Sequence, residues 1–547
     1  MMNMMMQIIQ RSVCTAGVLM CLMTTQATAQ AAKSSATPKV VDDGIVIEDV
    51  TLISPERKVP VPHAVVVIRD GRIVEIGINL VAGPHAKRID GHGRFLIPGL
   101  IDSHTHVGNG NTGPLDDDAI SAHPELVQAY RSQLPRAYLV FGFTTLVDLD
   151  VREQALSWFN AAPVHPNLYH CGRGVRIVGG YTALQPPKNA ASANSTNSVY
   201  EAAEAKSWPE TLDPRDYTPA RAVDRVVEAG GICVKTFVEP GFGGAFHWPV
   251  PSPETLHALR EETRRRGLIF VVHANGVDSW RAALDAKADV IAHGLWHWPG
   301  DLLGTTPPLE ARAVIQAAAR AGVGVQPTMQ AVYGDKSIFD RSLLDDPRLP
   351  EALSRVLVAY LKSEEAQASY RATANEYKQA IAQLLGPSAP DAASLMSIAP
   401  ARATATLRMM LAENVKLLFG SDTPSNEGIG NPPGLNGRFE LTRWFEAGVP
   451  LSRILRAATL DNATAFGLSK DLGTIEVGKR ADLLLLSADP LETIAGLSCR
   501  RTKRLVRQRL YRTTSVAMPE AGTCNWSPRV GATTRKVCTV RISTFLT

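Results

Sequence analysis

The sequence predicts an α/β protein: a TIM-like (β/α)8 barrel with a small β-sandwich domain built from both ends of the chain. The length of 547 residues is too great for one small domain but suits a barrel of ~250 residues or more. Hydrophobic residues make up 45% and charged residues 20%, which supports a large buried core. From residue 100 onward, apolar runs alternate with longer helical patterns, as in parallel strands joined by helices.

The first 29 residues have the order of a signal peptide. They contain one base, Arg11, and no acid; an apolar stretch follows over 13–23, and then Ala27-Thr28-Ala29. We therefore expect export, to a periplasmic or extracellular location, with cleavage near Ala29; a disordered start is the alternative. No segment reaches the ~20 apolar residues of a membrane helix, so no membrane span is expected.

The small domain is assigned to residues 40–97 together with 471–512. Both segments contain short apolar strand patterns, and Asp70-Gly71 predicts a hairpin turn between two of them. Residues 98–470 then form the barrel, and 513–547 a C-terminal tail to which the sequence assigns no role. Two cysteines of that tail, Cys524 and Cys538, are the candidates for a disulfide.

Eight barrel strands are expected, with an open doubly wound sheet as the alternative. They are residues 96–103, 144–149, 168–178, 232–238, 268–273, 290–293, 322–328 and 416–421. Two long connections, 181–220 and 330–414, follow the third and seventh strands, and the second contains a helical pattern over 349–385. Because loops after barrel strands face the catalytic mouth, both connections are candidate lids.

Charge gives no sign of a polyanionic partner. The formal net charge of +4 arises from 57 basic and 53 acidic residues, which is nearly balanced. Residues 500–512 are rich in arginine and lysine but lack an aromatic platform, so an exposed strand edge is favoured over a nucleic-acid surface. The expected partner is a small-molecule substrate, and a homo-oligomer is left open.

Chemically active side chains occur where apolar runs meet glycine, asparagine or proline. His104 and His106 end the first strand, and because alternate strand residues point the same way, both can bind one metal ion. The ends of strands four, five, six and eight carry Lys235, His273, His293 and Asp422. Each has an ordinary structural explanation when taken singly. Together they lie at the carboxyl ends of strands, where barrel active sites are built, and predict a metal centre.

With these residues the chain resembles the amidohydrolase superfamily, in its binuclear, carboxylated-lysine, prolidase- and imidazolonepropionase-like form. The resemblance spans roughly residues 40–512 and also rests on segments 98–106 (PGLIDSHTH), 420–422 (GSD) and 473–483 (GTIEVGKRADL). It implies two divalent metal ions, for which zinc suits the histidine-rich ligand set best. His104, His106 and Asp422 would bind the first ion, His273 and His293 the second, and carboxylated Lys235 would bridge them.

The resemblance also implies a mechanism and a reaction. Two cations would share a bridging hydroxide and polarise the substrate carbonyl, with Asp422 as general base and later proton donor. The expected activity is hydrolysis of an amide, cyclic imide or related C–N bond other than a classical peptide bond, for example in a dipeptidase or prolidase-like reaction. The alternatives are a lactonase or phosphotriesterase-like hydrolase on the same site, a one-metal aminohydrolase, and a non-enzymatic barrel binding protein.

Aromatic side chains on loops at the mouth are the expected substrate contacts. Tyr181 follows Gly179-Gly180 after the third strand, at a turn where the relatives carry histidine. The other candidates follow the Lys235 and His293 strands and are Phe242, His247, Trp248, Trp296 and His297. They predict a pocket for an apolar, N-aryl or N-acyl substrate; the alternative is that they only pack the lids.

Overall fold

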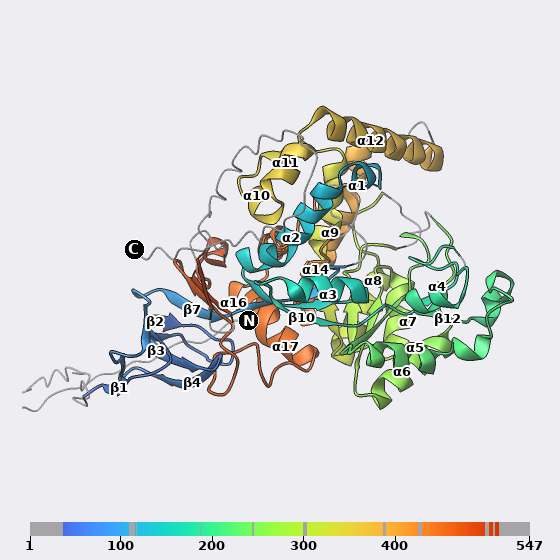
Figure 1. Ribbon diagram of the computed structural model, residues 1–547. Helices are drawn as coiled ribbons and strands as arrows, with labels where there is room; N and C mark the ends of the chain where they lie inside the picture. The colour runs from blue at the N-terminus through green and yellow to red at the C-terminus, as the bar shows by residue number, and fades with distance from the viewer. Residues whose placement is uncertain are drawn as a thin grey trace, which may run out of the picture.

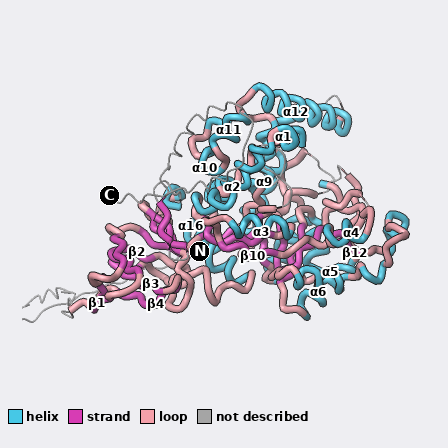
Figure 2. The backbone as a smooth tube through the Cα atoms, viewed as in Figure 1, coloured by secondary structure: helices cyan, strands magenta, loops and turns pink. Residues whose placement is uncertain are grey.

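The structure is a computed structural model that describes residues 37–108, 115, 117–185, 187–242, 246–298, 303–386, 390–424, 429–497, 503–506 and 509–512 (Figures 1 and 2). The expected signal peptide, Cys524, Cys538 and the rest of the tail lie outside the described residues. Within these ranges, every helix is too short or too polar to cross a bilayer.

The two segments assigned to the small domain contribute strands to one mixed sheet. Its strands are β2 (Ile45–Leu52), β3 (Val61–Arg69), β4 (Arg72–Gly77), β6 (Lys87–Asp90), β7 (Phe95–Pro98), β18 (Leu483–Leu486), β19 (Lys503–Val506) and β20 (Arg509–Arg512). They follow the order β20-β19-β18-β7-β2-β3-β4, with β6 on β2. Figure 1 shows the blue N-terminal strands beside the orange-red C-terminal ones.

The predicted hairpin is present, but a two-layer sandwich stays a prediction. Asp70 and Gly71 adopt φ values of 48° and 73° and connect β3 to antiparallel β4. The remaining strands of this region, β1 (Lys39–Val41) and β5 (Leu80–Ala82), pair with each other in a separate parallel ladder. The described strands therefore form one sheet and one pair.

The expected barrel strands all contain observed strands, which form two parallel arcs. The first arc consists of β8 (Leu100–Thr105), β9 (Phe143–Asp148) and β10 (Asn167–His170). The second consists of β13 (Cys233–Phe237), β14 (Ile269–His273), β15 (Val290–Ala292), β16 (Gly324–Gln326) and β17 (Lys416–Leu417). The expected strand 96–103 is divided at Gly99: β7 joins the small sheet and β8 the first arc. A Cβ on Gly99 would lie 2.0 Å from Thr144 Oγ1, so only glycine fits there.

A closed eight-stranded barrel is not seen among the described strands, which corrects the prediction of full closure. No regular ladder crosses the two seams between the arcs among the described residues. The isolated bridges Thr105–Thr423 and Val175–Thr236 and a few backbone hydrogen bonds, such as that from the Ile232 N–H to the His170 carbonyl, connect the strands there. β17, the last strand of the second arc, covers only two residues. Further along the chain, Asp422 has a positive φ, which is incompatible with a regular strand. The expected third strand is likewise interrupted, into β10 and β11 (Arg176–Ile177), which pairs with β12 (Ser198–Val199).

A disulfide that the sequence analysis did not predict joins the arcs at the second seam. Cys171 follows β10, Cys233 begins β13, and their Cα atoms are 4.4 Å apart. Both residues are fully buried. The bond therefore holds together two strands that share no regular ladder.

Helices cover the strands and form the longer of the two candidate lids. They are α1 (Asp117–Ala122), α2 (Pro124–Val140), α3 (Glu153–Ala161), α4 (Ala190–Ser195), α5 (Pro219–Glu228), α6 (Pro253–Arg265), α7 (Val277–Asp285), α8 (Leu309–Ala321), α9 (Met329–Gly334), α10 (Leu349–Ala352), α11 (Arg355–Leu361), α12 (Glu364–Leu385), α13 (Ala392–Leu395), α14 (Ile398–Ala412), α15 (Leu435–Glu446), α16 (Leu451–Arg456) and α17 (Asn462–Ala465). The largest apolar cluster lies between helices and strands and includes Phe143, Trp280 and Trp444.

The expected helix over 349–385 is three helices, α10 to α12, which lie at the top of Figure 1. Two serines explain the breaks. The side chain of Ser354 accepts a hydrogen bond from the Leu357 N–H and that of Ser363 from the Ala366 N–H, so each caps a new helix.

Candidate metal centre

The histidine pair at the end of β8 faces the carboxylate that follows β17. His104 Nε2 and His106 Nε2 lie 3.2 and 3.0 Å from Asp422 Oδ1. The backbone holds this arrangement, because the Asp422 N–H donates to the His104 carbonyl at 2.7 Å. As predicted from their spacing, the two histidines project to the same side of the strand.

The other two histidines complete a cluster of imidazoles. The His273 and His293 ring centroids are 4.4 Å apart, and His293 lies 4.9 Å from the His104 ring. Potential ligand atoms of His104, His293 and Asp422 all lie within 4.8 Å of one another. His293 has a φ of 89° and forms a 2.9 Å hydrogen bond between its Nδ1 and Thr328 Oγ1, which fixes the ring.

Lys235 is buried in β13 beside this cluster. Its side chain is 1% exposed, and its Nζ lies 5.4 Å from the Phe237 ring centroid. Burial lowers the pKa of Lys235 to about 8, although the charge of Asp422 opposes this shift. The charge of Lys235 also acts to lower the pKa values of all four histidines, which places this lysine near the whole cluster.

The histidines have the properties of metal ligands. His104 Nδ1 and His106 Nδ1 are buried without a hydrogen-bond partner, which is rare for polar atoms in folded proteins, and His104 Nε2 has only the contact with Asp422 Oδ1. Burial lowers the pKa of His104 to about 3 and that of His293 well below its usual value, so both rings are neutral at pH 7. The neutral rings of His104 and His293 beside an ionised carboxylate are donors that suit a divalent cation.

Asp422 stays ionised in this setting. Burial opposes its charge, but the neighbouring histidines, led by His104, hold the pKa of the carboxyl well below its usual range. A second acid, Asp102, holds the backbone next to Asp422 by accepting a 3.0 Å hydrogen bond from the Ser421 N–H. Burial raises the pKa of Asp102 to about 7.

Sequence reasoning missed Glu239, a carboxylate behind His273. It is 1% exposed, and its Oε2 lies 3.3 Å from His273 Nε2. Burial opposes its ionisation, but hydrogen bonds, first of all from His273, lower its pKa to about 2. The signal was present, since Glu239 follows a buried strand and precedes Pro240-Gly241, the same kind of position as the predicted ligands.

Five of the six predicted substrate residues form an aromatic wall beside the cluster: Tyr181, Phe242, Trp248, Trp296 and His297. The Tyr181 ring lies 5.0 Å from His273 and stacks on Trp248 at 5.5 Å. Phe242 packs against Tyr181 at 5.4 Å and His297 at 6.1 Å. Trp296 lies 5.8 Å from His293. The sixth residue, His247, is exposed and lies outside the ring contacts found for this wall.

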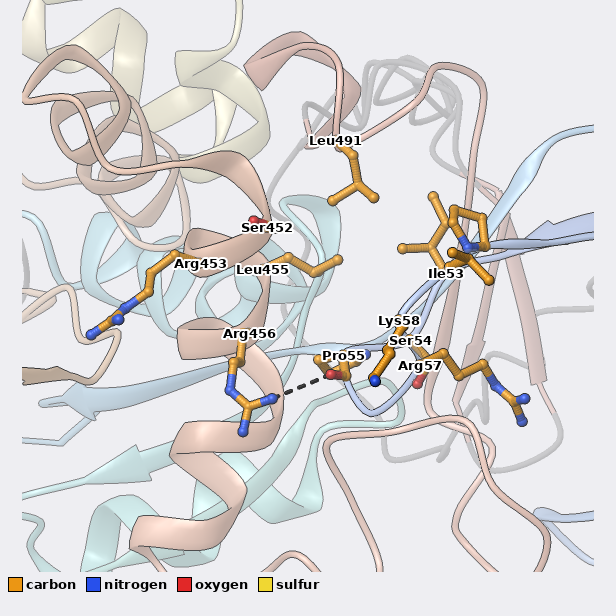
Figure 3. Close-up of a pocket in the computed structure, with 12 residues that line it drawn as sticks. Ile53, Ser54, Pro55, Arg57, Lys58, Ser452, Arg453, Leu455, Arg456 and Leu491 are labelled. Atoms are coloured by element: carbon orange, nitrogen blue, oxygen red, sulfur yellow. Dashed lines mark hydrogen bonds between the residues drawn. The ribbon is translucent and has the colours of Figure 1, made fainter. Parts of the chain in front are cut away.

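A pocket elsewhere in the molecule contains none of these residues. It lies between residues 53–60 of the small domain and helix α16 (Figure 3). Two of its cations already have partners, because Arg456 donates to the Pro55 carbonyl and Arg57 pairs with Glu56. The buried polar cluster at the strand ends therefore remains the better candidate site.

Comparisons with known proteins found similar sequences and folds. Adenine deaminase of Paracoccus denitrificans (strain Pd 1222) is 39% identical over 56 residues, which are 10% of this chain and only 9% of that relative. The crystal structure of a Xaa-Pro dipeptidase with methionine bound in its active site has a TM-score of 0.57 at 20% identity, over 86% of this chain and 99% of that one. Molinate hydrolase has a TM-score of 0.57 at 19% identity, over 90% and 99%.

At these identities the solved structures show the fold alone, a TIM-barrel-type arrangement of mixed α/β content. The family match is broader. The amidohydrolase family matches residues 95–507, which include every predicted metal ligand and most of the 547-residue chain. The chain therefore belongs to the amidohydrolase family.

Proposed function

We propose that this chain is a metal-dependent hydrolase that cleaves an amide, cyclic imide or related C–N bond in a small apolar substrate. The observation that carries the proposal is the buried cluster of histidines around Asp422, in which His104 Nδ1 and His106 Nδ1 have no hydrogen-bond partner. His104, His106 and Asp422 would hold one cation, His273 and His293 a second, with Lys235 between them. Zinc suits these ligands best.

Lys235 acts as a bridging ligand in its carboxylated form. An ammonium would be repelled by two cations, whereas a carbamate offers two oxygens and a negative charge. The lowered pKa of Lys235, about 8, gives a larger fraction of the neutral amine that reacts with carbon dioxide. When bound, the cations supply Lewis-acid polarisation of the substrate carbonyl and acidify water.

Asp422 is the acid–base residue of the proposed reaction. Its low pKa keeps it ionised, so one of its oxygens accepts the proton of the attacking water. The same oxygen then returns that proton to the leaving nitrogen. Asp102 and the 420–422 turn hold the carboxylate in place through the Ser421 hydrogen bond.

The aromatic wall favours a substrate with an apolar group. Tyr181, Trp248 and Phe242 present adjoining ring faces and edges next to His273, where an aryl or branched alkyl group would pack and water would be excluded. The names of the fold relatives suggest two substrates to test first, an Xaa-Pro dipeptide and molinate.

Metal analysis and a substrate panel test this function. Purified protein should contain about two zinc ions per chain, and chelation should abolish hydrolysis that zinc with bicarbonate restores. The panel comprises Xaa-Pro dipeptides, N-acyl amino acids with aromatic or small side chains, cyclic imides, molinate, lactones and phosphotriesters. Preference for lactones or phosphotriesters would replace the C–N bond assignment. If the protein contains no metal and binds ligands equally well with and without a chelator, it is a binding protein instead.

We also propose that the chain is exported after cleavage near Ala29. The Cys171–Cys233 disulfide supports this location, because such bonds persist in oxidising compartments. Fractionation of cells that express the full chain should recover the protein, shortened at its N-terminus, outside the cytoplasm. A version that lacks residues 2–29 serves as the control and should stay inside, with free thiols at both positions.

A further inference from the structure

Glu239 is a buried carboxylate whose partners lie on two sides of the proposed site. It follows β13 by two residues, and no ion pair with lysine or arginine is found for it in the described part of the chain. One oxygen faces His273, and the other accepts hydrogen bonds from the Gly241 and Phe242 N–H groups at 2.8 and 2.6 Å. The two oxygens of this buried side chain therefore hold two different neighbours, the His273 ring and the backbone of residues 241 and 242.

The first contact determines which nitrogen of His273 carries the proton. The Gly241 and Phe242 N–H groups donate to Oε1 of Glu239, as to a carboxylate. A carboxylate accepts hydrogen bonds, which assigns the proton of the 3.3 Å contact between His273 Nε2 and Glu239 Oε2 to His273. Asn275 Nδ2 also approaches Nε2, but at 3.5 Å and without charge. With the proton on Nε2, the lone pair of Nδ1 is free for a cation.

The second contact holds the turn that carries Phe242 into the aromatic wall. This turn is strained, because Phe242 has a φ of 48° and Gly241 a φ of 133°. A Cβ on Gly241 would lie 2.2 Å from the Phe246 carbonyl oxygen, so the backbone passes itself closely here. Two hydrogen bonds to one carboxylate oxygen stabilise that conformation.

We propose that Glu239 is a positioning residue that couples the metal ligand His273 to the substrate wall at Phe242. It sets the tautomer of His273 with one oxygen and the position of the Phe242 ring with the other. The proposal rests on the metal site of the proposed function. It assigns a role that none of the predicted ligands fills, and it makes metal affinity and apolar substrate affinity depend on one side chain.

Two substitutions separate the two contacts. Glu239→Gln keeps an oxygen for the turn but directs an N–H group at His273 Nε2, which favours the wrong tautomer. Zinc affinity, measured by competition with a chromophoric chelator, should fall about 10- to 100-fold. The KM for an aromatic substrate should stay within about twofold of wild type. Glu239→Ala removes both contacts and should raise that KM as well.

Glu201→Gln is the matched control, because Glu201 is a buried acid that accepts the Ser252 N–H at 2.9 Å away from the cluster. It should retain wild-type zinc affinity and KM. Wild-type zinc affinity in Glu239→Gln would overturn the role at His273. An unchanged KM in Glu239→Ala would overturn the role at Phe242.

A measurement on the unmodified chain keeps the test independent of folding defects and of activity. The ¹⁵N shifts of His273, assigned by their loss in a His273→Asn variant, should show a protonated Nε2 and an unprotonated Nδ1 at pH 7. A protonated Nδ1 would overturn the proposal. A chain with this tautomer that binds zinc but hydrolyses nothing would contradict the proposed function and leave the assignment of Glu239 intact.

Discussion

Gly420 and His104 lie so close together that a Cβ on the glycine would be 2.6 Å from the Cβ of the histidine. The strand end that carries Asp422 thus approaches the histidine strand closely enough for Asp422 Oδ1 to reach His104 Nε2. We predict that Gly420→Ala displaces His104, lowers zinc content and destabilises the fold by about 1–3 kcal/mol. Thermal unfolding and metal analysis measure both effects.

Gly276→Ala is the control for this substitution. A Cβ there would meet its nearest neighbours at 3.7 Å, which is ordinary contact. It should change neither the zinc content nor the unfolding temperature by much. Equal behaviour of the two variants would show that close approach at Gly420 does not matter to the site.

Lys235→Ala should lose metal and activity together. Without the bridging ligand, turnover should fall more than about 100-fold, since loss of ligands outweighs the 10- to 100-fold effect of outer partners. Short carboxylic acids such as propionate should enter the space left by the side chain and restore part of both. Zinc content and initial rates, measured with and without propionate, decide the matter; wild-type turnover in the variant would rule out the bridge.

The Cys171–Cys233 bond should contribute about 4 kcal/mol to the free energy of unfolding, as expected for a closed loop with a sequence separation of 62. The Cys171→Ser/Cys233→Ser double variant should lose that amount in urea denaturation. Because Cys233 lies in the strand of Lys235, metal affinity should fall as well. A reductant should reproduce these losses in wild type and add nothing in the double variant.

Glu440 should make the stability of wild type fall as pH rises. Burial raises the pKa of Glu440 to about 7 in the folded state, against 4.5 as the ordinary value. The folded chain therefore holds a proton that the unfolded chain releases between these values, and stability decreases by up to about 1.4 kcal/mol per pH unit. Urea denaturation at pH 5 and pH 7 should show a larger loss in wild type than in Glu440→Gln, because the raised pKa of Asp102 contributes equally to both proteins. Parallel pH curves for the two proteins would contradict it.

Trp248→Ala should weaken binding of aryl substrates without loss of metal. Trp248 stacks on Tyr181 at 5.5 Å, and an aromatic contact of about 0.5–1.5 kcal/mol corresponds to a KM increase of about 2- to 12-fold. Trp158→Ala, in α3 and outside the wall, is the control of the same residue type. An equal KM for aryl and small substrates in Trp248→Ala would remove the wall from substrate binding.

The sequence predicted the strands and the six clustered residues because both depend on local signals. An apolar run followed by a turn residue identifies the end of a strand, and strand ends meet in a parallel sheet. His104 and His106 needed only the two-residue period of a strand. Lys235 and Asp422 needed only their positions at such ends.

The remaining features depend on contacts that no local pattern reports. The division of the first strand at Gly99 reflects the close approach of Thr144, and the incomplete closure reflects the turn of the backbone at Asp422. Cys171 and Cys233 pair across a seam, far apart in the chain. Glu239 becomes significant only once His273 is placed beside it.

The pairing of β7 with β18 has a consequence for biosynthesis. Leu483 lies opposite Pro98, directly before the strand that carries His104. Because synthesis runs from the N-terminus, β7 acquires this neighbour only after the ribosome has reached residues 483–486. The sheet that unites the two segments can therefore be completed only after every predicted metal ligand, the last of which is Asp422, has been synthesised.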